Sequence, residues 1–257
     1  DDASKDTPFA YKNRAMIRES SAFGARNFLN TAPIPTFDGR LMATYDAGRP
    51  WEISPDRLEL TTPLGTHEQW RPMIPPLTDA QRFQSQSMST AHPTYDPHTR
   101  EMFSVNFAPL VPGLSAEPFF DVMWWGDDGV VKCAPLVDED GEACIITMSC
   151  HQMHVTERYV ILIDSAVLVE PEQLFGQDVT RPQSAVTPIW VVPRAELNNG
   201  QPVTAQLYTV PCESAHFLAA YDDSEGLELL LVHQCSSDPS EWVRLDDRQA
   251  HNGQEVH

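Results

Sequence analysis

Short apolar runs, long enough only for strands, divide the 257-residue chain from end to end. Glycine, aspartate and many of the 22 prolines stand between these runs, and no stretch keeps the 3.6-residue period of an amphipathic helix. Proline lacks the backbone donor that helices and central strands need, so it marks the ends of elements. The pattern predicts an all-β fold of many short strands, as in a propeller, a barrel or a sandwich.

Several turn signals locate these strands. Asp127-Asp128-Gly129 predicts a tight hairpin between strands over residues 119–125 and 130–133, because Asp-Gly tolerates positive φ angles. Asp38-Gly39 leads into a strand over residues 40–45, and Asp96-Pro97 precedes an alternating strand over residues 101–107. Further strands are expected over residues 143–149, 159–163, 186–192, 203–210 and 227–233, with single helical turns near residues 79–85 and 170–175.

Composition limits the partners and the compartment. The formal net charge of -20 argues against nucleic acid and against electrostatic docking on anionic lipid, but it does not indicate a substrate. The five cysteines are odd in number and contain no Cys-x-x-Cys pair, which favours free thiols and a reducing, cytoplasmic compartment. We expect one domain over residues 1–257, without a membrane span or signal peptide, and with both ends cut from a longer chain.

Three of the nine histidines share a setting at the edge of an expected strand, among small or polar neighbours. Imidazole suits iron, zinc, copper or nickel, so we predict that the three rings meet at one metal ion. No acid stands at the short helical spacing of a zinc protease, and a structural role for each ring stays open on these grounds. His154 follows the second of them by an odd spacing, so at most one of that pair is expected to face the centre. The three are His92, His151 and His216.

Four ordered motifs resemble those of the carotenoid cleavage oxygenases. Residues 30–50, from Asn-Thr-x-x-Ile to Gly-Arg-Leu-Met-Ala, are similar to the family's first segment. Thr90-Ala91-His92-Pro93 and its sequel resemble the first iron-ligand motif. His151 with Thr156-Glu157-Arg158-Tyr159 is similar to the second, and residues 192–194 with 216–222 to the third.

The resemblance implies a seven-bladed β-propeller, incomplete in this chain, with Fe(II) held on its axis by four histidines. His92, His151 and His216 would be three of them, and also the catalytic residues. Asp46 would orient one ring from the second shell. Such enzymes use O2 to split a carbon–carbon double bond of a lipophilic polyene or stilbene into two carbonyl products.

Departures from the family pattern qualify this expectation. The region of the fourth histidine has no counterpart, Asp46 stands where the family has Glu, and Gln152 replaces the usual Asp. Tyr45 replaces the Lys of stilbene-cleaving members, which favours a carotenoid or apocarotenoid.

The predicted function is therefore an Fe(II)-dependent dioxygenase that acts on a carotenoid-like alkene. The alternatives are a truncated, non-catalytic propeller that binds an apolar ligand, and an alkene isomerase, hydrolase or stilbene cleaver on the same scaffold. The expected location is the cytoplasm, with peripheral membrane contact compatible with a lipophilic substrate, and the oligomeric state is left open.

Overall fold

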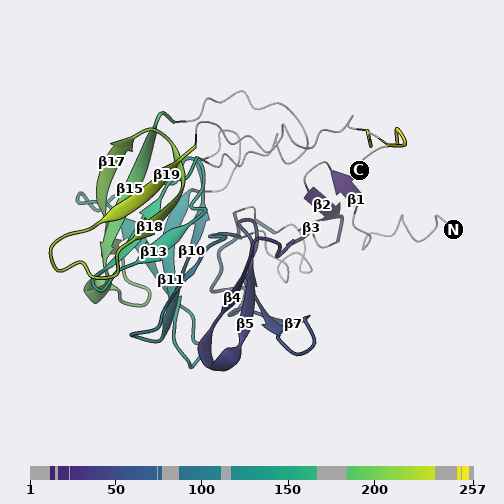
Figure 1. Cartoon of the computed structure of the whole chain (residues 1–257), viewed down its shortest axis with the longest axis horizontal. Coiled ribbons are helices and arrows are strands. Elements are labelled where there is room, and N and C mark those ends of the chain that lie inside the picture. The colour runs from purple at the N-terminus through teal and green to yellow at the C-terminus, as the bar shows by residue number, and fades with distance from the viewer. Residues whose placement is uncertain are drawn as a thin grey trace.

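The structure, a computed structural model, describes residues 12–14, 17–22, 24–73, 75–76, 87–110, 117–166, 184–234, 248–249 and 251–254, and the side chains of all these except 12–19 and 38. Within these ranges strands form almost all of the regular structure, which confirms the predicted all-β class (Figure 1). The two helical elements there are single 3-10 turns, η2 (Phe37–Gly39) and η3 (Arg194–Glu196). The helical turns expected near residues 79–85 and 170–175 lie outside the described residues.

The N-terminal part forms two antiparallel sheets in which each strand pairs with the next along the chain. At the Asp38-Gly39 turn, Gly39 has a φ of +77° and the Arg40 amide donates to the Phe37 carbonyl, so the predicted turn forms. The strands are β1 (Lys12–Arg14), β2 (Ile17–Ser20) and β3 (Gly24–Ala25) in the first sheet, and β4 (Ala32–Pro35), β5 (Leu41–Thr44), β6 (Trp51–Ser54) and β7 (Glu59–Pro63) in the second.

A six-stranded sheet follows, and its two longest strands are buried on both faces. The predicted hairpin at Asp127-Asp128-Gly129 is confirmed, with a φ of +68° at Gly129, although its second strand begins at Lys132 rather than Val130. The strands are β8 (Met88–Ser89), β9 (Thr94–Asp96), β10 (Glu101–Ala108), β11 (Phe119–Trp125), β12 (Lys132–Val137) and β16 (Val203–Thr204).

The last two sheets contain the remaining strands. The predicted strand over residues 203–210 divides, because β16 pairs in parallel with β12 and the next residues pair with β15. One apolar run therefore joins two sheets. The strands are β13 (Met153–Val155), β14 (Tyr159–Ile163), β15 (Val186–Pro193) and β17 (Gln206–Pro211) in one sheet, and β18 (Ser214–Ala219) with β19 (Leu229–His233) in the other.

The strand expected over residues 143–149 is wrong. This segment is irregular, with isolated bridges at Ala143 and Ser149. The amides of residues 147–149 donate to the buried carboxylate of Asp164, at 2.7 to 3.0 Å, and are therefore not available to a neighbouring strand. Asp164 thus fixes the loop that leads into His151.

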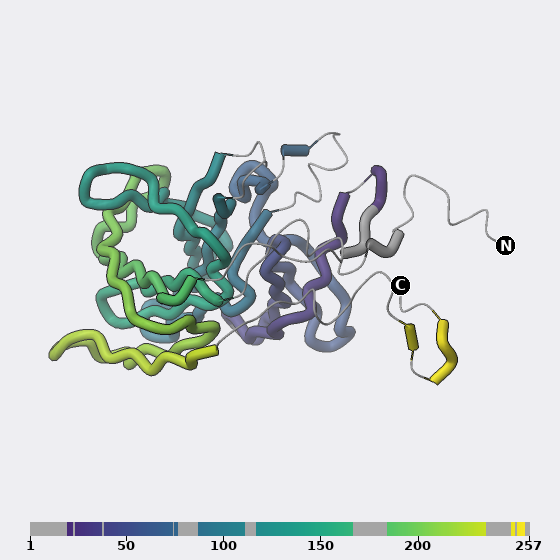
Figure 2. Tube along the Cα trace, turned by 90° about the horizontal axis from the view of Figure 1, so that it is seen from above, coloured from purple at the N-terminus to yellow at the C-terminus, as the bar shows by residue number. Residues whose placement is uncertain are grey.

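The sheets share a core. A cluster of buried side chains spans β10 to β15, and within it the rings of Phe120 on β11 and Trp190 on β15 lie 5.4 Å apart, edge to face. A second cluster joins Met42 and Trp70 to Met102 and Trp125, and so connects the β4–β7 sheet to β10 and β11. Seen from above, the strands of residues 87–234 gather in one body (Figure 2), and the β1–β3 sheet lies apart from it, as labelled in Figure 1.

Nowhere in the described ranges does a helix reach the length and apolarity that a membrane span needs. The four cysteines that fall within these ranges, Cys133, Cys144, Cys150 and Cys212, are free.

Candidate metal centre

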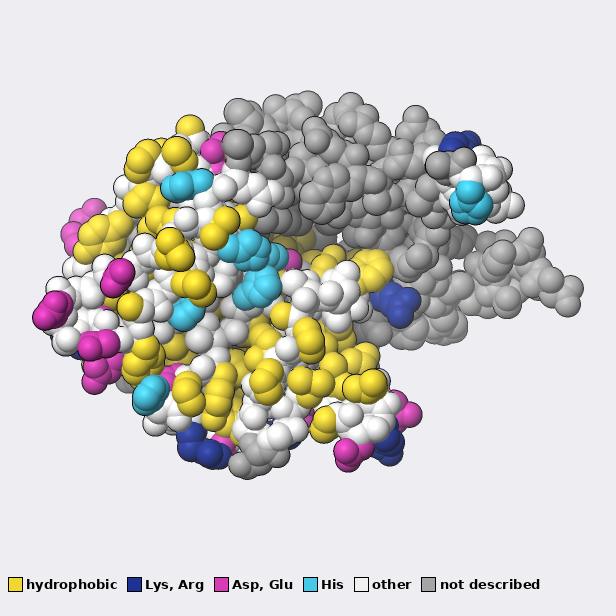
Figure 3. Space-filling view, viewed as in Figure 1, with side chains coloured by type: hydrophobic (Ala, Val, Ile, Leu, Met, Phe, Trp, Pro, Cys, Tyr) yellow, Lys and Arg dark blue, Asp and Glu magenta, His cyan; other side chains and the backbone are white. Residues whose placement is uncertain are grey.

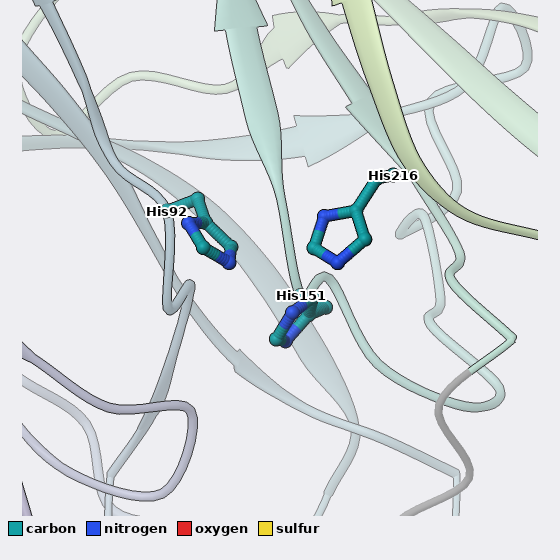
Figure 4. Close-up of side chains that lie close together, drawn as sticks. All are labelled: His92, His151 and His216. Atoms are coloured by element: carbon teal, nitrogen blue, oxygen red, sulfur yellow. The ribbon is translucent and has the colours of Figure 1, made fainter. Parts of the chain in front are cut away.

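Three segments far apart in sequence bring His92, His151 and His216 together (Figure 4). His92 follows β8, His151 precedes β13, and His216 lies within β18. One nitrogen of each ring lies within 4.8 Å of the other two, and the ring centroids are 4.8 to 5.2 Å apart. The predicted convergence is therefore present, while the role of the rings as metal ligands stays a prediction.

The backbone explains why two of these segments meet. The His151 carbonyl accepts the Ala91 amide at 3.1 Å and the His92 amide at 3.2 Å. The Thr90 hydroxyl donates to the same carbonyl at 2.8 Å. Each of these bonds joins the segment of His92 to that of His151, so the two rings are placed by main-chain geometry rather than by side-chain contact alone.

Asp46, which the sequence expects to orient one of the three rings, lies behind His151, and its orienting role stays a prediction. Its Oδ1 is 2.8 Å from His151 Nδ1, a direct contact that its shorter side chain makes without a bridging water. The turn that carries Asp46 is held by Ser89, whose amide donates to the Asp46 carbonyl at 2.8 Å. The Ser89 hydroxyl lies 3.0 Å and 2.8 Å from the carbonyls of Tyr45 and Gly48.

Gln152 lies behind His216, and sequence reasoning gave it no role. Its Oε1 is 2.9 Å from His216 Nδ1 and 3.1 Å from the Phe217 amide. The only sequence signal was its position beside His151, where the resembled motif has an acid. That signal marks the residue as unusual, but it does not say that its partner is a ring 64 positions away.

Burial favours the neutral imidazole at His92 and at His216. Burial, followed by the neighbouring His151 and His216 rings, lowers the pKa of His92 to about 4. Burial, followed by the His151 ring, also lowers the pKa of His216. A neutral imidazole has one lone-pair nitrogen, and three of these beside one gap fit a single Fe, Zn, Cu or Ni ion.

The other histidines of the described ranges lie outside this group. His154 packs edge to face on Phe217 at 6.0 Å, so of the pair His151 and His154 only the former faces the centre. His151 precedes the strand, however, so the reason is not the alternation of one strand. His98 stacks on Tyr221 at 4.4 Å, while His67, His233 and His251 are exposed.

A second group of contacts joins the three segments that carry the histidines, and it is centred on the guanidinium of Arg194. Its Nη1 lies 2.7 Å from Asp96 Oδ2 and donates to the Thr156 carbonyl at 2.7 Å. Tyr221 donates its hydroxyl to the same Asp96 oxygen at 3.2 Å. Asp96 comes four residues after His92, and Thr156 and Tyr221 come five residues after their own histidines. We call Arg194, Asp96, Thr156 and Tyr221 the arginine clamp.

Residues 4–256 match the family described as RPE65, retinal pigment epithelial membrane protein, and the chain belongs to this carotenoid oxygenase-type family. The cobalt-substituted apocarotenoid oxygenase of Synechocystis has a similar structure, with a TM-score of 0.54 and 15% identity over 82% of this chain and 41% of that chain. The lignostilbene dioxygenase of Pseudomonas brassicacearum aligns with a TM-score of 0.49 and 19% identity over 75% of this chain and 34% of that chain. No curated protein matches the sequence.

The fold is the β-propeller type of this family, and the chain spans 41% and 34% of the two solved structures. The predicted family and fold class are thus confirmed.

Proposed function

We propose that the protein is a non-haem Fe(II)-dependent dioxygenase that cleaves a carbon–carbon double bond of a carotenoid- or apocarotenoid-like polyene. Two carbonyl products and the uptake of both atoms of O2 are the expected outcome. His92, His151 and His216 would hold the iron, and Asp46 would orient His151. Residues 1–257 would form part of a single propeller domain within a longer protein.

The observation that carries this proposal is the arrangement of the three rings. They present nitrogens within 4.8 Å of one another from three separate segments, and hydrogen-bond acceptors occupy the outer edges of two of them. Outer partners of this kind orient metal-binding imidazoles and raise their basicity. Three imidazole nitrogens that converge on one point are the ligand atoms that a transition-metal ion prefers.

The metal ion, Asp46 and the histidine rings would have different roles in this reaction. A ferrous ion would supply the activation of dioxygen next to the alkene. Asp46 keeps a proton on His151 Nδ1 and leaves the other ring nitrogen to bind metal. Imidazole ligands, unlike carboxylates, add no negative charge to the site.

The surroundings support an apolar, uncharged substrate. Histidine side chains gather on one face of the molecule with hydrophobic side chains beside them (Figure 3). Burial, and then the charge of Asp46, raises the pKa of Tyr45 to about 12, so this residue is uncharged at neutral pH. A lipophilic alkene is the substrate class that suits hydrophobic side chains beside the histidines. Peripheral membrane contact and a cytoplasmic location belong to the same proposal.

Metal content and product analysis on the intact protein test the proposal together. We expect one iron per chain, and cleavage products of an apocarotenoid that carry oxygen-18 from 18O2 at both new carbonyls. His92→Ala, His151→Ala and His216→Ala should each lower bound iron at least tenfold, because each removes a ligand. His154→Ala is the matched control, since its ring is partly buried nearby but lies outside the group.

Any of three results would contradict the proposal. One is iron retained at the wild-type level by all three alanine variants. Another is an untouched double bond in the product, which would indicate isomerisation. The third is no product at all from iron-loaded protein, which would indicate a non-catalytic propeller.

A further inference from the structure

The side chain of Gln152 holds one oxygen between two nitrogens of β18. Oε1 lies 2.9 Å from His216 Nδ1 and 3.1 Å from the Phe217 amide nitrogen. Gln152 also forms an isolated parallel bridge with His92 and directly follows His151. One residue therefore touches all three segments that carry the histidines.

The Phe217 contact determines which way the Gln152 amide faces. A backbone N–H can only donate, so the Gln152 atom beside it must be the carbonyl oxygen. The same oxygen faces His216 Nδ1, which must therefore carry the hydrogen and donate it. In a neutral imidazole the other nitrogen then holds the lone pair, so Nε2 of His216 is left free for the centre.

The rings of His151 and His216 thus differ in the charge of the group that faces Nδ1. His151 Nδ1 faces the carboxylate of Asp46, whereas His216 Nδ1 faces a neutral amide. A carboxylate partner makes an imidazole a stronger electron donor than an amide partner does, because it stabilises partial positive charge on the ring.

We propose that Gln152 is a positioning residue for His216: its amide oxygen fixes the Nδ1–H tautomer and the ring orientation, and does so without adding negative charge behind the ring. This proposal rests on the metal centre proposed above. It assigns a role to a residue that departs from the acid of the resembled motif, and it explains how His216 is held by the chain described here.

The first test uses metal-free protein and reads the tautomer directly. Long-range proton–nitrogen NMR of the histidine rings should show His216 as the Nδ1–H form in the wild type. Gln152→Leu should lose this preference, and Gln152→Glu should keep it, because a carboxylate oxygen can accept from both nitrogens. A wild-type His216 in the Nε2–H form would overturn the proposal, whether or not the protein binds metal.

The second test titrates the protein with Co(II) alone and follows its visible absorption bands. Gln152→Leu should weaken Co(II) binding about 10- to 100-fold, the usual cost of losing an outer partner of a metal ligand. Gln152→Glu should bind at least as tightly as the wild type. Gln206→Leu, on the exposed face of β17, is the control and should bind normally.

The outcomes separate the two proposals. Co(II) binding that does not change in Gln152→Leu would overturn the role of Gln152 and leave the metal centre intact. A wild-type protein that binds no Co(II) would overturn the metal centre itself, and the Gln152 proposal with it. Should Gln152→Leu fail to fold, Gln152→Glu still decides, because weaker Co(II) binding by that variant would contradict the predicted rescue.

Discussion

Two polar groups lie on the same three segments, and they differ in whether their hydrogen-bonding capacity is satisfied. In the arginine clamp, Arg194 reaches Asp96, the Thr156 carbonyl and the Thr99 hydroxyl, and its guanidinium lies 4.8 Å from the Phe103 ring. In the histidine group, acceptors hold Nδ1 of His151 and of His216, but the inner nitrogens face one another.

This difference in hydrogen bonding indicates a structural role for the arginine clamp and a binding role for the histidine group. A buried charge is tolerated when it is paired and hydrogen-bonded, as in the clamp. Three partly buried imidazole nitrogens that converge on one point form a ligand set for a transition-metal ion, so the histidine group fits a bound cation. The clamp fixes the segments four or five residues beyond the rings, and the rings can therefore stay unsatisfied without the segments separating.

The largest expected effect separates the two groups by stability. Arg194→Met leaves the buried Asp96 carboxylate without its cation and should lower the free energy of unfolding by about 3–5 kcal/mol. His92→Ala should lower it by about 1 kcal/mol or less, because its ring lacks such a charge partner. Urea unfolding of both variants measures this, and equal losses would remove the distinction.

The next effect is the dependence of the clamp on pH. Burial opposes the ionisation of Asp96, but bonds from the His98 amide and from Arg194 outweigh burial and lower its pKa. A depressed pKa adds stability above the ordinary value of about 3.9, and this stability is lost as the pH falls through the folded value. Asp96→Asn should be less stable than wild type at pH 7, and the gap should narrow below pH 4. Urea midpoints from pH 7 to pH 3 check this, and a constant gap would contradict it.

The smallest effect concerns the support of the histidine group. Ser89→Ala removes the hydroxyl beside the Tyr45 and Gly48 carbonyls and should cost about 1 kcal/mol. It should also weaken Co(II) binding severalfold, since it loosens the turn that carries Asp46. Thr61→Ala is the control, because its hydroxyl bonds the Glu52 carbonyl on an exposed sheet and should leave Co(II) binding unchanged. Equal Co(II) affinity in Ser89→Ala and wild type would show that Asp46 does not depend on this turn.

Sequence reasoning succeeded where local chemistry decides the structure. The Asp-Gly turns, the strand over residues 159–163 and the all-β class follow from turn residues and apolar runs. It failed where backbone groups hydrogen-bond to residues that are distant in the sequence. Residues 143–149 look like a strand, yet Asp164 accepts their amides, and residues 203–210 look like one strand, yet two sheets share them.

The site shows the same division. The motifs picked out His92, His151, His216 and Asp46, because a ligand motif has a fixed local pattern. They did not assign a role to Gln152 or connect Arg194 with Asp96, because each of these contacts joins residues that only folding makes neighbours.

The class of fold, the family and the three imidazoles to examine could all be read from the amino-acid sequence, since turn chemistry and motif order are properties of short segments. Two features emerge only on folding: the His151 carbonyl joins the segments of His92 and His151, and an amide rather than a carboxylate holds His216. A hydrogen bond depends on distance and direction in space, and the pairing of residues about 60 positions apart is set by how whole sheets pack.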